Sequence, residues 1–180
     1  SLTIAAGESL YAVNNLTVQT AGALTNSGAL EAYKQLNFNA AQIDNSASII
    51  GNDVTLTATT VNNTGATALI GALNNLTVNA SNVTNQDSAT LYAGNDLKIQ
   101  GDASGNPGNS LTNSSAIIEA GRDISLNMNQ ITNQRTSVVV TPVVTSSINL
   151  YYKAYGDVWP GAPYSGNTIY LMYSPLTPYE

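Results

Sequence analysis

The sequence predicts an all-β chain that folds as a parallel β-helix, a solenoid of about 20 residues and three short strands per coil. Three observations predict this fold class. One apolar-x-Asn phrase recurs at nearly constant spacing, the segments between its copies alternate apolar and polar residues, and no segment shows a helical pattern ten residues long.

The recurring phrase appears first in "LTNSGALEAYKQLNFNAAQIDN", residues 24–45, which begins on Leu-Thr-Asn and ends on Ile-Asp-Asn. Its closing asparagines are Asn26, Asn45, Asn63, Asn85, Asn113 and Asn133, in steps of 19, 18, 22, 28 and 20 residues. The longest step contains "GDASGNPGNS", residues 101–110, whose turn-forming residues predict an inserted surface loop.

Equivalent positions of stacked coils lie directly above one another, so a once-per-coil asparagine can hydrogen-bond to its copy in the next coil. Asparagine also tolerates the left-handed backbone of tight corners. We expect a structural corner ladder; the other interpretation, a row of binding residues, is less favoured.

An alternating phrase recurs with the same spacing, as in "NLTVQT", "QLNFNA", "DVTLTA", "NLTVNA", "DLKIQG" and "DISLNM". Apolar residues at every second position indicate half-buried strands. A third phrase, such as "ATLYAGN", adds a short apolar strand to each unit. A unit this small cannot bury its apolar face alone, so stacking six or seven coils, about 4.7–4.9 Å apart, supplies the shared core.

Composition excludes several function classes. Charged residues make up 9% of the chain, against roughly 25% in typical globular proteins. The net charge is -6 and the five Lys and Arg are scattered, which argues against nucleic-acid binding. The sequence contains no apolar run of 18 residues, so it predicts no membrane-spanning helix. Because the chain starts in mid-pattern, we interpret it as an internal fragment of a longer protein.

The chain has no His and no Cys, which excludes His-based catalysis, thiolate metal sites and disulfides. Asp53, Asp96 and Asp123 open the same repeated strand, and a β-helix enzyme acting on polysaccharides would gather carboxylates in this way. Asp and Asn alternate at that position, however, which favours a role at the start of the strand. We therefore expect no enzyme activity, no cofactor and no metal site.

The phrases "LYAGNDLKIQG" and "IIEAGRDISLN" carry a family resemblance. Over about Leu2 to Arg135, the order D/N-apolar-x-apolar-x-A, apolar-x-N and A-G-x-D resembles the filamentous haemagglutinin repeat. The resemblance implies a right-handed parallel β-helix in a giant exoprotein of the bacterial surface, secreted through an outer-membrane two-partner secretion transporter. Such proteins include haemagglutinin adhesins and CdiA-type exoproteins of contact-dependent growth inhibition, which deliver toxins. Neither the amino-terminal secretion domain nor a carboxy-terminal toxin is recognisable here.

The repeat pattern stops after Arg135, which predicts two regions, a β-helix over 1–135 and an irregular Tyr/Pro-rich region over 136–180. Seven of the ten Tyr, the only Trp and four of the six Pro lie from Tyr151 onward. This region covers the open end of the helix, binds a partner or connects to the next segment, and the first two roles are compatible with each other. The candidate partner-binding residues are Tyr151, Tyr152, Tyr155, Trp159, Tyr164, Tyr170 and Tyr173.

The expected function is that of a non-enzymatic segment of a secreted bacterial surface filament. CdiA-type proteins have a receptor-binding region beside a Tyr/Pro-rich segment, and the junction near Arg135 resembles that boundary. The expected partner is therefore a protein or glycan receptor on a target cell. A passive stalk that contacts no receptor is the alternative, and a polysaccharide-active enzyme is a weaker one.

Overall fold

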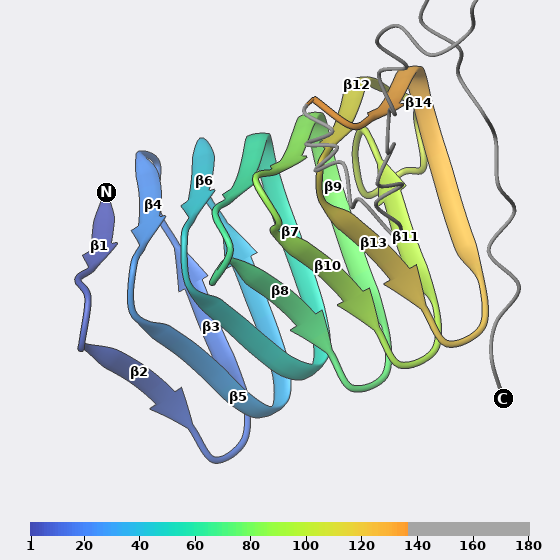
Figure 1. The fold of residues 1–180 in the computed structure, drawn as a ribbon. Coiled ribbons are helices and arrows are strands. Elements are labelled where there is room, and N and C mark those ends of the chain that lie inside the picture. The colour runs from blue at the N-terminus through green and yellow to red at the C-terminus, as the bar shows by residue number, and fades with distance from the viewer. Residues whose placement is uncertain (137–180) are drawn as a thin grey trace, which may run out of the picture. The chain divides into compact units, whose positions relative to one another are not determined.

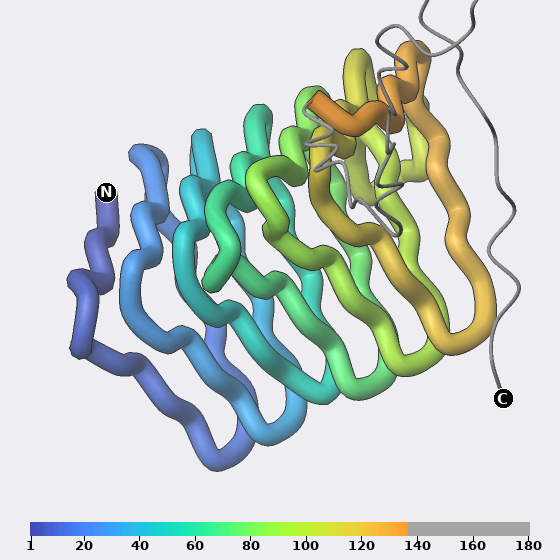
Figure 2. The backbone as a smooth tube through the Cα atoms, viewed as in Figure 1, coloured from blue at the N-terminus to red at the C-terminus, as the bar shows by residue number. Residues whose placement is uncertain are grey.

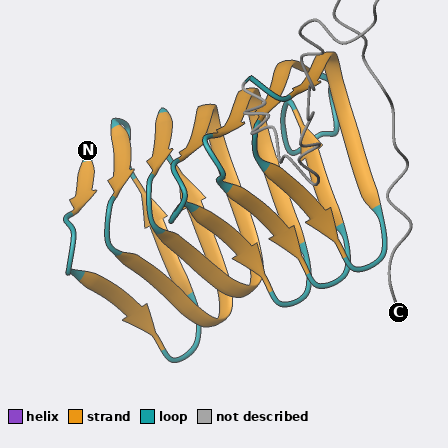
Figure 3. Ribbon diagram, viewed as in Figure 1, coloured by secondary structure: helices purple, strands orange, loops and turns teal. Residues whose placement is uncertain are grey.

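The computed structural model describes residues 1–136, and in this part of the chain every regular element is a β-strand (Figure 3). The chain divides into two units, Ser1–Val138 and Val139–Glu180, and the fold described below belongs to the first unit. Its strands wind in successive right-handed coils, each displaced along one axis from the coil before it (Figures 1 and 2). These coils confirm the predicted parallel β-helix.

Three sheet faces run along the coils. The face that ends on the repeated asparagines, called the Asn face here, contains β1 (Leu2–Ile4), β4 (Ala23–Asn26), β6 (Gln42–Asn45), the ends of β7 (Ser48–Thr64) and β9 (Leu76–Gln86), β12 (Gly108–Ser114) and the end of β14 (Ile124–Gln134). The second face contains β2 (Ser9–Ala12), the start of β5 (Ala29–Asn39), the start of β7, β8 (Leu69–Ala72), β10 (Thr90–Ala93) and β13 (Ile117–Ala120). The third face contains β3 (Leu16–Gln19), the end of β5, the middle of β7, the start of β9, β11 (Leu97–Gln100) and the start of β14.

Every strand pairing is parallel, and each joins equivalent positions of neighbouring coils. On the Asn face, Asn26 pairs with Asn45, and Asn45 pairs with Asn63. On the third face, Val78 lies between Leu56 and Ile99. The repeat spacing of the sequence is therefore the strand register of the structure, and the described residues form about six coils.

The predicted loop over residues 101–110 is three residues too long. Only residues 101–107 lie outside strands, and β12 begins at Gly108. Gly108 pairs with Met128, and a β-carbon at Gly108 would lie 2.6 Å from the Met128 side chain. Because glycine has no β-carbon, β12 can pair closely with β14 at this position. In the sequence, the turn propensity of the same glycine indicated a loop.

Stacking supplies the core, as the register of Leu97 and Ile124 shows. Both positions point inward at the start of a third-face strand, and they pair directly. Leu97 is fully buried because a coil covers it on each side, whereas Ile124, in the last described coil, is 48% exposed. A coil therefore buries its apolar residues mainly through its neighbours.

Two glycines mark a corner at which consecutive coils approach closely. A β-carbon at Gly94 would lie 2.0 Å from the Leu73 carbonyl oxygen, and one at Gly121 would lie 2.0 Å from the Gly94 carbonyl oxygen. Backbone blocks the space, so a methyl group cannot be accommodated by rotating a side chain. The A-G-x-D phrase of the repeat thus has a steric basis.

Gly94→Ala is expected to destabilise the fold by about 1–3 kcal/mol, because the added methyl forces the coils apart at this corner. Gly71→Ala is the matched control, since a β-carbon there meets nothing closer than 3.5 Å, an ordinary van der Waals distance. Urea unfolding of the two variants measures the difference. Equal midpoints for both would contradict the close approach.

Candidate functional site

The six repeated asparagines lie in one row and are joined by side-chain hydrogen bonds. The Nδ2 group of each donates to Oδ1 of the next, at 2.8 Å from Asn26 to Asn45, 2.8 Å from Asn45 to Asn63 and 2.9 Å from Asn63 to Asn85. The row continues at 2.8 Å from Asn85 to Asn113 and at 2.9 Å from Asn113 to Asn133. One amide chain therefore runs from Asn26 to Asn133, and Ile4 occupies the equivalent position on β1.

The same amides also bind main-chain carbonyl groups at the corner that follows. Asn63 Nδ2 donates to the carbonyl oxygen of Thr90 at 2.9 Å, and Asn85 Nδ2 donates to that of Ile117 at 2.8 Å. Asn26 and Asn45 make the same contact with Ser48 and Leu69, so four of the six asparagines fix the first residue of a second-face strand one coil further on. Within residues 1–136, no buried side-chain nitrogen or oxygen lacks a hydrogen-bond partner.

One part of the sequence rationale for these asparagines is wrong. The sequence predicts that they supply left-handed backbone at the corners, but within residues 1–136 the non-glycine residues with positive φ are Asp87, Ser88 and Ser115, at 58°, 70° and 50°. The asparagines instead lie on extended strands, and five of the six side chains are buried, from 0% exposed at Asn26 to 8% at Asn113. Asn133, in the last described coil, is exposed. Their amides, rather than their backbone freedom, explain their place in the coil.

A second polar ladder follows the corner between the second and third faces, and sequence reasoning missed it. Asp53 Oδ1 accepts hydrogen bonds from Asn74 Nδ2 at 2.8 Å and from Asn75 Nδ2 at 3.2 Å. Asn95 continues the contact by donating to Asn74 Oδ1. The signal in the sequence is the pair of polar residues that precedes each third-face strand, such as residues 52–53, 74–75 and 95–96.

The structure does not gather the three candidate carboxylates. Asp53 and Asp96 are separated by the coil that carries Asn75. The Asn75 side chain hydrogen-bonds to Asp53 Oδ1 and to the main-chain amide of Asp96, so it stands between the two carboxylates. Asp96 and Asp123 lie on adjacent coils, where Arg122 hydrogen-bonds to Asp96. That hydrogen bond, together with the guanidinium charge, holds the pKa of Asp96 below the usual range of an aspartate. The Asp96 carboxylate is therefore ionised at neutral pH and unsuited to act as a general acid.

No group of three or more potential metal-ligating side chains occurs within residues 1–136 that could hold an ion. Asp102 lies in the inserted loop, where Asn106 and Ser104 donate hydrogen bonds to its carboxylate. These bonds, with that of the Asn106 side chain foremost, lower the pKa of Asp102. Its oxygens therefore serve to close the loop on itself.

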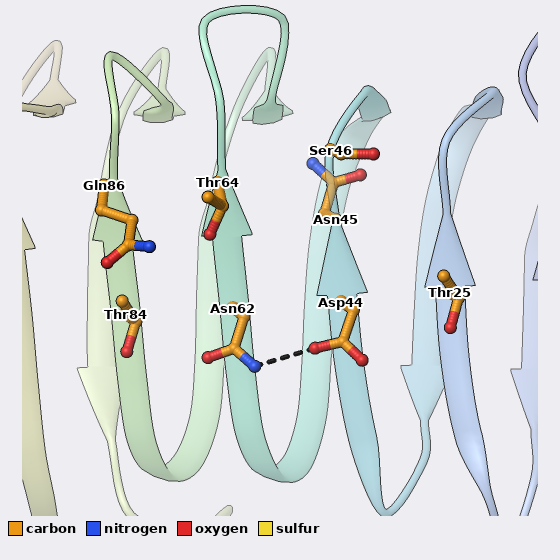
Figure 4. Close-up of a pocket in the computed structure, with 8 residues that line it drawn as sticks. All are labelled: Thr25, Asp44, Asn45, Ser46, Asn62, Thr64, Thr84 and Gln86. Carbon is orange, nitrogen blue, oxygen red and sulfur yellow. Dashed lines mark hydrogen bonds between the residues drawn. The ribbon is translucent and has the colours of Figure 1, made fainter.

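A hollow of about 360 Å³, lined by polar residues, lies on the outer side of the Asn face (Figure 4). Its floor is a row of outward side chains from β4, β6, β7 and β9, namely Thr25, Asp44, Asn62 and Thr84. Its rim contains Ser46, Thr64 and Gln86. No lysine, arginine or aromatic residue lines it.

The hollow exists because consecutive corners differ in length. Two residues, 46–47, connect Asn45 to the next strand, whereas five residues, 64–68, connect Asn63 to β8. The longer corner rises beside the shorter one (Figure 4) and is held there by the Thr67 hydroxyl, which donates to the Ser46 carbonyl oxygen at 2.9 Å. Gly65, with φ of 104°, allows the sharper turn. A departure from the repeat therefore creates the recess.

The carboxylate of Asp44 is held in a fixed orientation on this floor. Gln42 Nε2 donates to Oδ1 at 2.9 Å and to Oδ2 at 2.8 Å, and Asn62 Nδ2 donates to Oδ1 at 2.8 Å. Oδ1 thus accepts two hydrogen bonds from its neighbours and Oδ2 accepts one. The hollow therefore presents a negatively charged, oriented acceptor among hydroxyl and amide groups.

The candidate partner-binding residues, Tyr151, Tyr152, Tyr155, Trp159, Tyr164, Tyr170 and Tyr173, lie outside the described residues. Two other tyrosines, on the solenoid itself, are more than half exposed. Tyr11 lies on β2 and is 59% exposed, and Tyr33 lies at the corner that β5 crosses and is 71% exposed.

Comparison with known proteins finds one family model that matches part of the chain. The model of the haemagglutinin repeat family matches residues 100–141, which contain β12, β13 and β14. A search of curated proteins gives no significant match, and neither does a search of solved structures. No helix within residues 1–136 has the length and apolar character needed to cross a bilayer. The family match and the β-solenoid together support a filamentous haemagglutinin-like repeat protein.

Proposed function

We propose that this chain is a non-enzymatic segment of the β-helical filament of a large, secreted bacterial surface exoprotein, and that it contributes to adhesion. The observation that carries the proposal is the hydrogen-bonded asparagine row, which joins every coil from Asn26 to Asn133. Each coil contacts mainly its two neighbours, so the same unit can be added repeatedly and the filament lengthened without a new core.

The chemistry of the described surface agrees with a structural and adhesive role. The carboxylates that suggested an enzyme are spread over different coils, and Asp96 is paired with Arg122. The outer strand positions carry mostly hydroxyl and amide groups, such as Thr25, Asn62 and Thr84. Such groups favour hydrogen-bonded contact with another surface and do not need a metal or cofactor.

The finer proposal is that the segment binds a protein or glycan receptor on a target cell, as part of contact-dependent growth inhibition. Its support is the resemblance of the repeat to CdiA-type exoproteins and the Tyr/Pro-rich composition that begins at Tyr151. Export through a two-partner secretion transporter belongs to the same proposal. The alternative is a passive stalk that contacts no receptor, which the structural row of asparagines favours equally.

A cell-binding titration tests the adhesive role. Fluorescently labelled residues 1–180 and a version that ends at Thr136 are titrated onto panels of bacterial and host cells, after circular dichroism has shown that both are rich in β-structure. Saturable binding by the longer chain alone would place the receptor contact in residues 137–180. Binding by both would place it on the solenoid, and no binding by either folded chain would leave a passive stalk.

A further inference from the structure

The hollow on the Asn face offers a set of hydrogen-bonding groups that the filament itself does not need. The asparagine row and the core bury their groups inside the coil, whereas Thr25, Asp44 and Thr84 point outward into the recess (Figure 4). We infer that this hollow is a binding site for a neutral pyranose sugar. The inference extends the adhesive role proposed above, on which its biological meaning rests.

The first argument is the match of donors and acceptors. A carboxylate oxygen accepts two hydrogen bonds in its plane, and Asp44 Oδ2 receives one from Gln42. The second lone pair of Oδ2 is suited to a hydroxyl of the ligand. The Thr25 and Thr84 hydroxyls and the Gln86 amide each donate and accept, as do the successive hydroxyls of a sugar ring.

The second argument is charge. Asp44 is the single ionisable residue among those that line the hollow, and the chain has a net charge of -6. An acidic sugar, a sulfate or a phosphate would bring a second negative charge against Asp44 with no lysine or arginine to compensate it. A metal ion would find one carboxylate only, fewer than a calcium site normally uses. The electrostatics therefore favour a neutral polyol.

The third argument is geometry. The volume of about 360 Å³ lies near the lower end of the range for small-molecule sites. Gln42 and Asn62 already hold the Asp44 carboxylate, so binding does not have to order it. The recess is open on one side and has no aromatic wall. We therefore expect a dissociation constant of about 1 mM or weaker for a single sugar.

The test is a titration of the 180-residue chain, followed by NMR chemical shifts, with the methyl glycosides of glucose, galactose and mannose and with N-acetylglucosamine. At least one is expected to shift the signals of Thr25, Asn62 and Thr84. N-acetylneuraminic acid is the negatively charged comparison sugar, and it is expected to produce no saturable shift. Preferential binding of the acidic sugar, or no saturable shift with any neutral sugar, would overturn the inference.

Asp44→Asn replaces the free acceptor by a donor and is expected to weaken binding about tenfold or more, because hydrogen bonds to charged groups are the strong ones. Asp123→Asn removes the same charge from an exposed position on a different face and should leave affinity unchanged. Thr84→Val keeps the shape of the floor, removes one hydroxyl and should also weaken binding. Unchanged affinity in both Asp44→Asn and Thr84→Val would contradict the site.

This test is separate from the cell-binding titration. Sugar binding in solution without cell binding would support the site and count against the adhesive role. Cell binding by a chain that binds no neutral sugar in solution would support the adhesive role and count against the sugar site. Cell binding that is lost in Asp44→Asn and retained in Asp123→Asn would show that the sugar site is responsible for adhesion.

Discussion

Replacing Asn63 by alanine is expected to lower the free energy of unfolding by about 2–4 kcal/mol, because it interrupts the amide row at its centre. Asn63 is fully buried and donates to Asn85 Oδ1 and to the Thr90 carbonyl oxygen, both at 2.9 Å. Without it, these two acceptors lose a hydrogen bond in a place that water reaches poorly. Leaving a buried polar group unpaired costs about 1–3 kcal/mol each.

The chain provides its own matched control one residue earlier. Asn62 is the same residue type on the same strand, but its side chain points outward, where its Nδ2 donates to Asp44 at 2.8 Å. Asn62→Ala should cost about 1 kcal/mol or less, since water can replace the lost partner. Urea unfolding of both variants measures the difference, and equal losses would show that the inward row contributes no more than a surface hydrogen bond.

Val78→Asp is expected to have a larger effect, with several kcal/mol lost and the central coils unfolding first. Val78 is fully buried between Leu56 and Ile99 of the adjacent coils, which are themselves fully buried. A carboxylate there would lie between two buried apolar side chains, so it must either lose its charge or open the core. Because the fold is a stack, the loss should spread to the neighbouring coils.

Thr77→Asp is the control for Val78→Asp, because Thr77 is half-exposed on the outer side of the same strand. Hydrogen exchange of the β7, β9 and β11 amides, with the melting temperature, measures both variants. We expect faster exchange across these strands in Val78→Asp and little change in Thr77→Asp. An unchanged melting temperature in Val78→Asp would mean that this side chain does not face the core.

Much of the fold follows from the sequence because the register of a solenoid is the spacing of its repeat. The closing asparagines of the repeated phrases pair in the structure as they align in the sequence, as Asn26 and Asn45 show. Period-two alternation predicted which strand residues point inward, and Leu76 and Val78 are both fully buried. Local patterns suffice here because each coil contacts mainly the coils beside it.

The candidate site was less predictable because it depends on departures from the repeat. The hollow forms where the two-residue corner after Asn45 lies beside the five-residue corner after Asn63. Sequence alone shows the extra residues but not that they rise beside Asp44. The start of β12 was misplaced for a related reason, since Gly108 and Pro107 signal a turn although Gly108 packs against Met128 in a strand.

The exchange of the asparagine side-chain amide protons, measured by NMR, tests most directly the central claim that one buried amide row ties the coils of this segment together. The Nδ2 protons of Asn45, Asn63 and Asn85 should be protected about as strongly as the backbone amides of β7 and β9. Those of the outward Asn62 should exchange at the rate of a surface side chain. Equal, rapid exchange of inward and outward asparagines would contradict the row and the filament role built on it.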